Sequence, residues 1–130
     1  MLKKILIVGL SVLIGFTSTM LSAQTSEFVK RAVISSAIEN REPVDNLSQI
    51  GADINKVYFF TEITNKANTM ITHRWFLNGR LEAEVVLKIG SDRWRTYSSK
   101  NLVPTMHTGD WQVEVVDETN KMIGSATFSY

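Results

Sequence analysis

Alternating stretches separated by turn residues most strongly constrain what this chain can fold into. Over 81–89 every second residue is apolar, and Glu82, Glu84 and Lys88 lie between the apolar positions. The segment 110–117 (DWQVEVVD) alternates in the same way, and 56–64 (KVYFFTEIT) is dense in aromatic and β-branched residues. Because successive side chains of a strand point to opposite faces, these stretches predict strands with one buried face.

Similar runs recur along the chain. We expect strands over 32–38, 56–64, 70–77, 81–89, 93–98, 110–117 and 122–130, and loops over 44–55 and 101–108. Asn78-Gly79 is the dipeptide most typical of a two-residue hairpin turn, and the polar residues of 24–30 predict a frayed start. About seven strands at spacings near ten residues predict an all-β, antiparallel, immunoglobulin-like β-sandwich.

The N-terminus has the layout of a secretory signal peptide. Lys3 and Lys4 precede an apolar run over 5–16, and small and polar residues then lead to Ala23. The alternative is a permanent membrane anchor, but the run falls well short of the roughly 20 residues that span a bilayer. We expect 1–23 to be cleaved, leaving 24–130 as a single domain in the periplasm, or secreted where there is no outer membrane, with no membrane span.

We expect the packing of tryptophan rings, rather than disulfide bonds, to stabilise the core. The chain contains no cysteine, although exported domains of this size often depend on disulfides. Trp75, Trp94 and Trp111 each fall in an expected strand, and we expect their rings between the two sheets. The absence of cysteine also excludes thiol catalysis and thiolate metal sites.

The charge balance gives no argument for nucleic acid as a partner. The chain has 14 basic and 13 acidic side chains, and loss of Lys3 and Lys4 leaves 12 basic against 13 acidic. Nucleic-acid binding usually requires a basic excess. The two histidines, His73 and His107, lie too far apart in sequence for a metal-binding motif. We expect no nucleic acid, no metal and no other cofactor.

Residues 93–100 (RWRTYSSK) form the most unusual stretch. Period-two alternation places Arg93, Arg95 and Tyr97 on one face of the strand, with Trp94 on the other. Guanidinium groups bind carboxylates and phosphates bidentately, and an aromatic ring stacks on sugars or cations. The candidate ligand-binding residues are Arg74, Arg93, Arg95, Tyr97 and Lys100.

Each of these candidate sites also has a structural interpretation. Arg93 and Arg95 can instead pair with Glu82 or Glu84 on a neighbouring strand as a solvated charge ladder. A second candidate is the segment Arg41-Glu42-Pro43. Arg41 and Glu42 form either a recognition loop or an anchor that pairs to the sheet, with Pro43 ending the first strand.

His73 offers the only route to catalysis that the residues suggest. A histidine on an apolar face is usually a satisfied core residue, and its functional alternative is a general base. A small hydrolase would need a serine such as Ser98 or Ser99, with His73 and Asp110. No G-x-S-x-G segment accompanies them, so we do not expect an enzyme and assign no catalytic residue.

Several short motifs together resemble a known family. They are Arg41-Glu42-Pro43-Val44-Asp45, Tyr58-Phe59-Phe60-Thr61, His73-Arg74-Trp75, Arg93-Trp94-Arg95 with Ser98-Ser99-Lys100, and Gly109-Asp110-Trp111 with Val113 and Val115. In this order they resemble the bacterial family known as domain of unknown function 2914. The resemblance implies an envelope protein of a Gram-negative bacterium with an immunoglobulin-like sandwich, and it implies no activity.

Together these observations favour a non-catalytic binding or interaction module of the periplasm or cell envelope. Its partner would be an anionic glycan, a lipid head group or an acidic envelope protein, and the sequence does not choose among them. One alternative is a structural domain that adds an edge strand to an envelope complex. The small hydrolase is the other alternative. The oligomeric state is left open.

Overall fold

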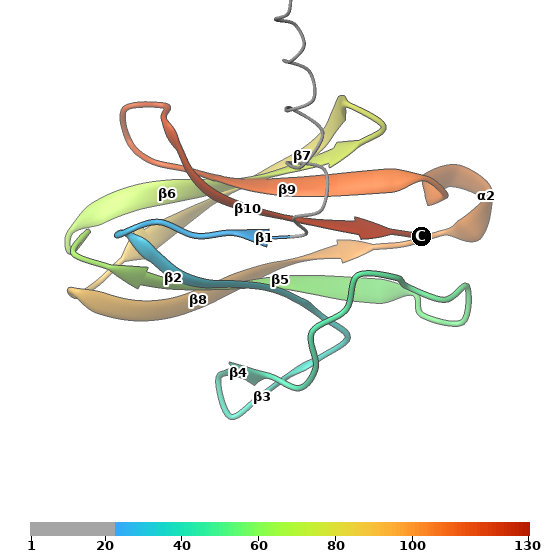
Figure 1. The fold of residues 1–130 in the computed structure, drawn as a ribbon, viewed down its shortest axis with the longest axis horizontal. Helices are drawn as coiled ribbons and strands as arrows, with labels where there is room; N and C mark the ends of the chain where they lie inside the picture. Colours follow the sequence, from blue (N-terminus) through green and yellow to red (C-terminus); the bar gives the residue numbers. More distant parts are fainter. Residues whose placement is uncertain (1–22) are drawn as a thin grey trace, which may run out of the picture.

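The computed structural model describes residues 23–130, and nearly all its regular structure is strand (Figure 1). The elements are β1 (Ala23–Gln24), β2 (Val29–Ser35), β3 (Ile38–Glu39), β4 (Glu42–Pro43), β5 (Lys56–Thr64), β6 (Thr69–Leu77), β7 (Arg80–Ile89), β8 (Arg93–Asn101), α2 (Pro104–His107), β9 (Asp110–Val116) and β10 (Met122–Ser129). A five-stranded sheet has the order β1-β10-β9-β6-β7, and a three-stranded sheet has the order β2-β5-β8. Within the described residues the named strands pair antiparallel, which confirms the expected all-β antiparallel class.

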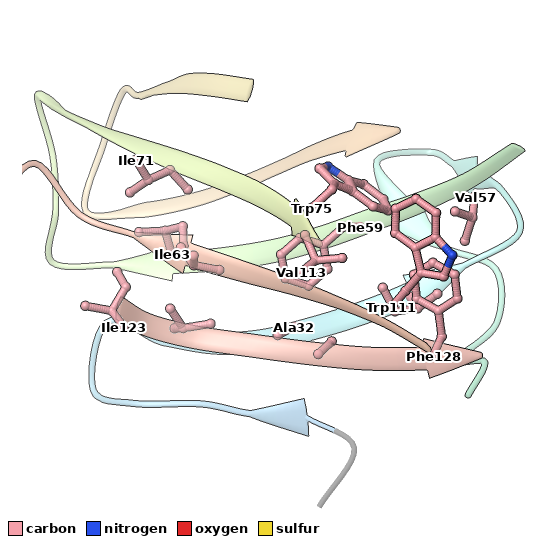
Figure 2. Packing of buried hydrophobic residues seen from close by; sticks show 14 of the residues in the cluster. Ala32, Val57, Phe59, Ile63, Ile71, Trp75, Trp111, Val113, Ile123 and Phe128 are labelled. Carbon is pink, nitrogen blue, oxygen red and sulfur yellow. The ribbon is translucent and has the colours of Figure 1, made fainter. Parts of the chain in front are cut away.

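The two sheets form separate layers with the hydrophobic core between them (Figure 1). Phe59 and Ile63 of β5 reach into this core from the three-stranded sheet, and Trp75 and Val113 reach into it from the five-stranded sheet (Figure 2). All four side chains are fully buried. The alternation seen in the sequence is therefore the pattern of one inward and one outward face per strand.

The tryptophans lie where their strands predict. Trp75 and Trp111 are almost completely buried, and their rings meet edge to face with centroids 6.4 Å apart. The Trp111 ring stacks on Phe128, with centroids 5.6 Å apart (Figure 2). Trp94 is half-buried and packs against the same cluster. Aromatic contacts of this kind stabilise the core beyond the burial of their area.

Most of the expected strands are confirmed. The range 56–64 is β5, and the hairpin at Asn78-Gly79 joins β6 to β7, with φ values of 49° and 83°. Both central residues of a two-residue hairpin turn of type I′ need positive φ, which Asn and Gly tolerate best. The loop expected over 101–108 contains the one-turn helix α2.

The N-terminal part of the domain differs from the expectation. The frayed start expected over 24–30 is wrong, because β1 pairs with the end strand β10 and β2 already begins at Val29. The strand expected over 32–38 ends earlier, at Ser35. Residues 38–43 then form a separate small hairpin, β3–β4, whose two-residue strands are too short to show a hydrophobic period.

A β-bulge changes the expected face of one residue. Opposite Trp75 and Phe76 the register of β7 shifts by one, so that Ala83 pairs with Trp75 and Leu81 pairs with Phe76. The extra residue moves Leu81 from the inner face to the outer face, where it is 47% exposed. Ile89, beyond the bulge, keeps its inward position and is buried.

The expected signal peptide lies outside the described residues except for its last position, Ala23. Among residues 23–130 no helix is long and apolar enough to cross a membrane.

Candidate functional site

Charged side chains gather on the outer face of the three-stranded sheet. Arg31, Arg41, Glu42, Arg93 and Arg95 line a pocket of about 320 Å³, and we call these five residues the arginine cluster. They come from β2, from the β3–β4 hairpin and from β8. Strand register explains the convergence, because Glu62 of β5 pairs with Arg31 on one side and with Arg95 on the other.

Glu62 is the buried carboxylate that orders two of these arginines. Its Oε1 accepts a hydrogen bond from Arg31 Nε and its Oε2 accepts one from Arg93 Nε, both at 2.7 Å. The Glu62 side chain is only 4% exposed. Burial raises its pKa, but the hydrogen bonds from Arg93 and Arg31 outweigh burial and lower the pKa below its usual value. Glu62 is therefore ionised at neutral pH.

Glu42 connects the β3–β4 hairpin to the sheet. Its two oxygens accept hydrogen bonds from Arg31 NH1 and NH2 at 2.8 and 3.0 Å, and Oε2 also accepts one from Arg95 NH1. The hydrogen bonds from Arg31, and then those from Arg95, lower the pKa of Glu42 to about 2. Of the two interpretations of this segment, the geometry matches the anchor for Glu42.

The internal partners expected for Arg93 and Arg95 are wrong. We expected Glu82 or Glu84, but Arg93 pairs with Glu62 and Arg95 with Glu42. The reason is topological: β8 pairs with β5 in the three-stranded sheet, whereas β7 belongs to the other sheet. In the five-stranded sheet Glu82 forms an ion pair with Arg80, and Glu84 forms one with Arg74.

The β3–β4 hairpin holds Arg41 in an unusual backbone conformation. Asn40 and Arg41 are the two residues of its turn and have φ values of 52° and 64°. At the base of the hairpin the carboxylate of Asp45 accepts hydrogen bonds from the hydroxyls of Ser35 and Ser36 and from the Ser36 amide. Burial raises the pKa of Asp45, and these hydrogen bonds lower it further than burial raises it.

Two guanidinium groups of the cluster keep unused donors. The Arg93 side chain is 79% exposed and, within the described residues, makes only the hydrogen bond from its Nε. Arg41 is exposed and forms no ion pair with any described residue. The cluster and Glu62 together carry four guanidinium groups against two carboxylates. This arrangement is suited to binding a carboxylate, phosphate or sulfate group.

The other sequence candidates are placed differently. Tyr97 lies on the same face as Arg95, is 46% exposed and contacts Tyr58 edge to face. Lys100 is an odd number of residues from Arg93 and Arg95 along β8, so its side chain lies on the opposite face of the strand from theirs. Arg74 lies in β6, in the other sheet, where it donates to Glu84 and to Asn120. The structure therefore brings Arg41, Glu42, Arg93, Arg95 and Tyr97 together, but not Arg74 or Lys100.

Sequence reasoning missed Arg31 and Glu62. Glu62 is the one acidic residue within the otherwise apolar or neutral run VYFFTEIT, and a carboxylate in such a strand needs a cationic partner. That signal was available in the sequence. Arg31 was missed because it lies between the start expected to be frayed, 24–30, and the strand expected over 32–38, whereas β2 begins at Val29. In the structure its guanidinium covers the buried Phe60 ring, with 4.7 Å between Cζ and the ring centroid.

His73 lies between the sheets as a satisfied core residue. Its Nδ1 is 2.7 Å from Ser98 Oγ and its Nε2 is 3.2 Å from Thr61 Oγ1. Ser98 Oγ also accepts a hydrogen bond from Trp75 Nε1 at 3.1 Å, and Thr61 Oγ1 donates to the Thr96 carbonyl at 3.4 Å. Burial lowers the pKa of His73 to about 3, so the ring is neutral at pH 7.

This network does not have the layout of a hydrolase site. Ser98 and His73 are hydrogen-bonded, but both are buried, and His73 is fully so. The remaining member of the proposed trio, Asp110, begins β9 and lines a hollow on the outer side of the five-stranded sheet with Phe76 and Gln112. A nucleophile must be reachable by substrate and its base must be oriented by an acid. Among the described residues no group of three histidine or acidic side chains could hold a metal.

Comparisons with known proteins give a family and a distant structural likeness. Residues 68–130 match the family described as Protein of unknown function (DUF2914), which confirms the family that the motifs suggested. No curated protein matches the sequence. The crystal structure of the CARDB domain of the PF1109 protein from Pyrococcus furiosus, in complex with di-metal ions, is 14% identical. The similarity covers 82% of this chain and 91% of that one, with a TM-score of 0.48.

Proposed function

On the premise that its C-terminal half matches a family of unknown function, we propose that this protein is a non-catalytic binding module of the bacterial envelope. It recognises an anionic group through the arginine cluster. The same proposal takes 1–23 as a cleaved export signal, the periplasm as the working compartment, and the two packed sheets as an immunoglobulin-like sandwich. Such a sandwich positions a site on a rigid sheet face, which favours binding.

The imbalance of charge in the cluster carries this proposal. Two carboxylates hold three of the four guanidinium groups and leave Arg41 without an ion pair among the described residues, so the pocket keeps an excess of positive charge at close range. Arg31 and Arg95 are held by Glu42, while Arg93 and Arg41 keep donors that face outward. Held side chains lose less conformational entropy when a ligand binds, so the internal ion pairs prepare the site for an anion.

The backbone of Arg41 supports the same conclusion. A φ of 64° in a two-residue turn is a position where glycine is strongly preferred, and a larger side chain there costs about 1 kcal/mol. Strained residues of this kind are concentrated at functional sites. Here the strained residue is an exposed arginine that lines the pocket.

Retention of the mature chain on immobilised dextran sulfate tests the proposal. We expect retention at low salt that weakens as salt rises, because exposed charges are screened within about 10 Å at 0.1 M ionic strength. The double variant Arg41→Gln with Arg93→Gln should lose at least about tenfold in affinity, because each charged hydrogen bond contributes about 1.5–3 kcal/mol. Arg31 still pairs with Glu62 and Arg95 with Glu42, so we expect the fold to survive the loss of the Arg93–Glu62 pair, and circular dichroism of the variant checks this.

Arg80→Gln is the matched control. Arg80 is 80% exposed and lies in the other sheet, at the β6–β7 hairpin. The substitution removes one surface charge without touching the cluster, so retention should stay near that of the unmodified chain. If Arg80→Gln weakens retention as much as either cluster substitution alone, binding depends on general charge and the proposal is wrong.

A further inference from the structure

β8 is a long and regular free edge. It ends the three-stranded sheet, and its pairing with β5 runs over nine residues, Arg93 to Asn101, without a shift in register. The other sheet ends differ. The pairings of β2 and β7 contain irregularities, and β1 is only two residues long. Proteins commonly blunt their edges in these ways, so β8 stands apart among the described strands.

Hydrogen bonds at both ends of β8 show which backbone groups face outward. Leu102 N donates to Asn55 O at 3.0 Å, and Asn65 N donates to Asp92 O at 2.9 Å. Even-numbered residues therefore point their backbone groups toward β5, since the pattern of an antiparallel pair alternates. The amides and carbonyls of the odd-numbered residues between them point to the free edge. Within 23–130 the Arg93 carbonyl accepts only from Ser91 Oγ.

The same odd-numbered residues carry the side chains of the site. Arg93, Arg95 and Tyr97 place their side chains on the outer face, and their neighbours Ser99 and Asn101 are exposed. A strand that paired with this edge would place the side chains opposite Arg93 and Arg95 on that outer face, within reach of the guanidinium groups. Backbone pairing and charge recognition would then involve one row of residues.

We infer that the anionic group recognised by the arginine cluster belongs to an extended acidic polypeptide segment, which adds as a strand to the free edge of β8. This inference rests on the proposed function and names its partner. Acidic residues at alternate positions of the segment meet Arg93 and Arg95, and the next position along meets the Tyr97 ring. Main-chain hydrogen bonds supply affinity and the alternating charges supply specificity.

A pair of synthetic peptides tests the inference on the mature chain. The first alternates glutamate and threonine over the length of β8, and the second has the same sequence with alternate backbone nitrogens methylated. Both have the same charge, but only the first can pair as a strand. We expect the methylated peptide to bind at least about tenfold more weakly by titration calorimetry. Hydrogen exchange should slow at the amides of Arg95, Tyr97 and Ser99 when the first peptide binds.

Two variants separate the edge amide from the side chain. Tyr97→Ala removes the ring, whereas Tyr97→Pro removes the ring and the outward N–H while leaving the pairing with β5 in place. The proline variant should bind the first peptide several-fold more weakly than the alanine variant, and both should be retained alike on dextran sulfate.

The outcomes distinguish this inference from the proposed function. Equal binding of the two peptides, or retention on dextran sulfate with no binding of either peptide, overturns strand addition and leaves anion binding intact. A glycan or lipid head group would give that result. Failure of both peptides and of dextran sulfate overturns both. Tighter binding of the unmethylated peptide with slowed exchange at the edge supports both.

Discussion

Ser98 is the residue on which the polar part of the core depends. Its hydroxyl accepts from Trp75 Nε1 and lies 2.7 Å from His73 Nδ1. Because the Thr61 hydroxyl donates to the Thr96 carbonyl, it accepts from His73 Nε2–H. In the neutral ring Nδ1 is then an acceptor, so the Ser98 hydroxyl donates to it. Every donor of this buried chain is used when the imidazole is neutral and carries its proton on Nε2.

The substitution Ser98→Ala should therefore destabilise the protein. It leaves the Trp75 N–H and one ring nitrogen of His73 buried without partners, so we expect a loss of about 2 kcal/mol in the free energy of unfolding. Urea unfolding measures it. Ser99→Ala at the neighbouring exposed position is the control and should change stability by no more than about 0.5 kcal/mol. Equal effects of the two would contradict this account of the core.

Single residues were predictable where their role is local. The face shared by Arg93, Arg95 and Tyr97 follows from period two alone, and the structure shows it. Their partners were not predictable, because Glu62 and Glu42 reach β8 through a strand pairing and a hairpin that the local pattern does not encode. His73 was predictable as a satisfied core residue, but its two hydroxyl partners, which come from other strands, were not.

At the level of elements, the β3–β4 hairpin gives the sharpest prediction. Arg41→Gly relieves the positive φ at the turn, and Arg41 has no described partner to lose, so the free energy of unfolding should rise by about 1 kcal/mol. Retention on dextran sulfate should fall. Arg41→Ala removes the same charge but keeps the strained backbone, so it should weaken retention equally without stabilising. Thermal unfolding and retention measured on both variants check this; a stable protein with undiminished retention would refute it.

The sequence predicted strands correctly where the alternation of apolar and polar residues extends over many residues. The β5, β6, β9 and β10 ranges agree with expectation to within one or two residues, because each spans several repeats of the alternation. Two-residue strands such as β3 and β4 contain no repeat to detect. The bulge that turns Leu81 outward depends on the partner strand and leaves no mark on the alternation of β7 itself.

For the whole molecule, buried His73 should make stability depend on pH. Its pKa is about 3 in the folded chain against about 6.5 unfolded, so its contribution is complete above pH 6.5 and is lost as pH falls toward 3. Between pH 6.5 and 5 the loss is about 2 kcal/mol, at about 1.4 kcal/mol per pH unit. Urea unfolding at both pH values should show it, and His73→Gln should remove most of the difference.

More acidic conditions should add a second loss. The pKa of Asp117 is raised by burial but lowered further by hydrogen bonds from Lys121 and Thr119 and by the charge of Lys66, and lies at about 2; that of Glu42 is also about 2. Carboxylates with depressed pKa values stabilise the fold above their unfolded pKa, and this contribution disappears between about pH 4.5 and 2. A pH dependence confined to this lower range would show that His73 is not buried as described.

The arrangement of the sheets was the least predictable feature. Alternation indicated an antiparallel all-β fold, but not that β7 and β8, which follow one another in the chain, belong to different sheets. Because the chain passes from one sheet to the other between β7 and β8, the arginines of β8 lie apart from Glu82 and Glu84. The alternation alone had suggested these glutamates as their partners. Sheet order is set by contacts between distant segments, which short-range patterns cannot reveal.

The regular edge of β8 also bears on whether two copies of this protein can pair with each other. If two copies paired in parallel and in register through this edge, the arginines of one copy would lie opposite those of the other, and like charges opposite each other in a sheet are unfavourable. Parallel, in-register stacking of copies into a fibril through this edge is therefore unfavourable. The same two arginines would favour a segment with acidic residues opposite them, as the proposed strand addition requires.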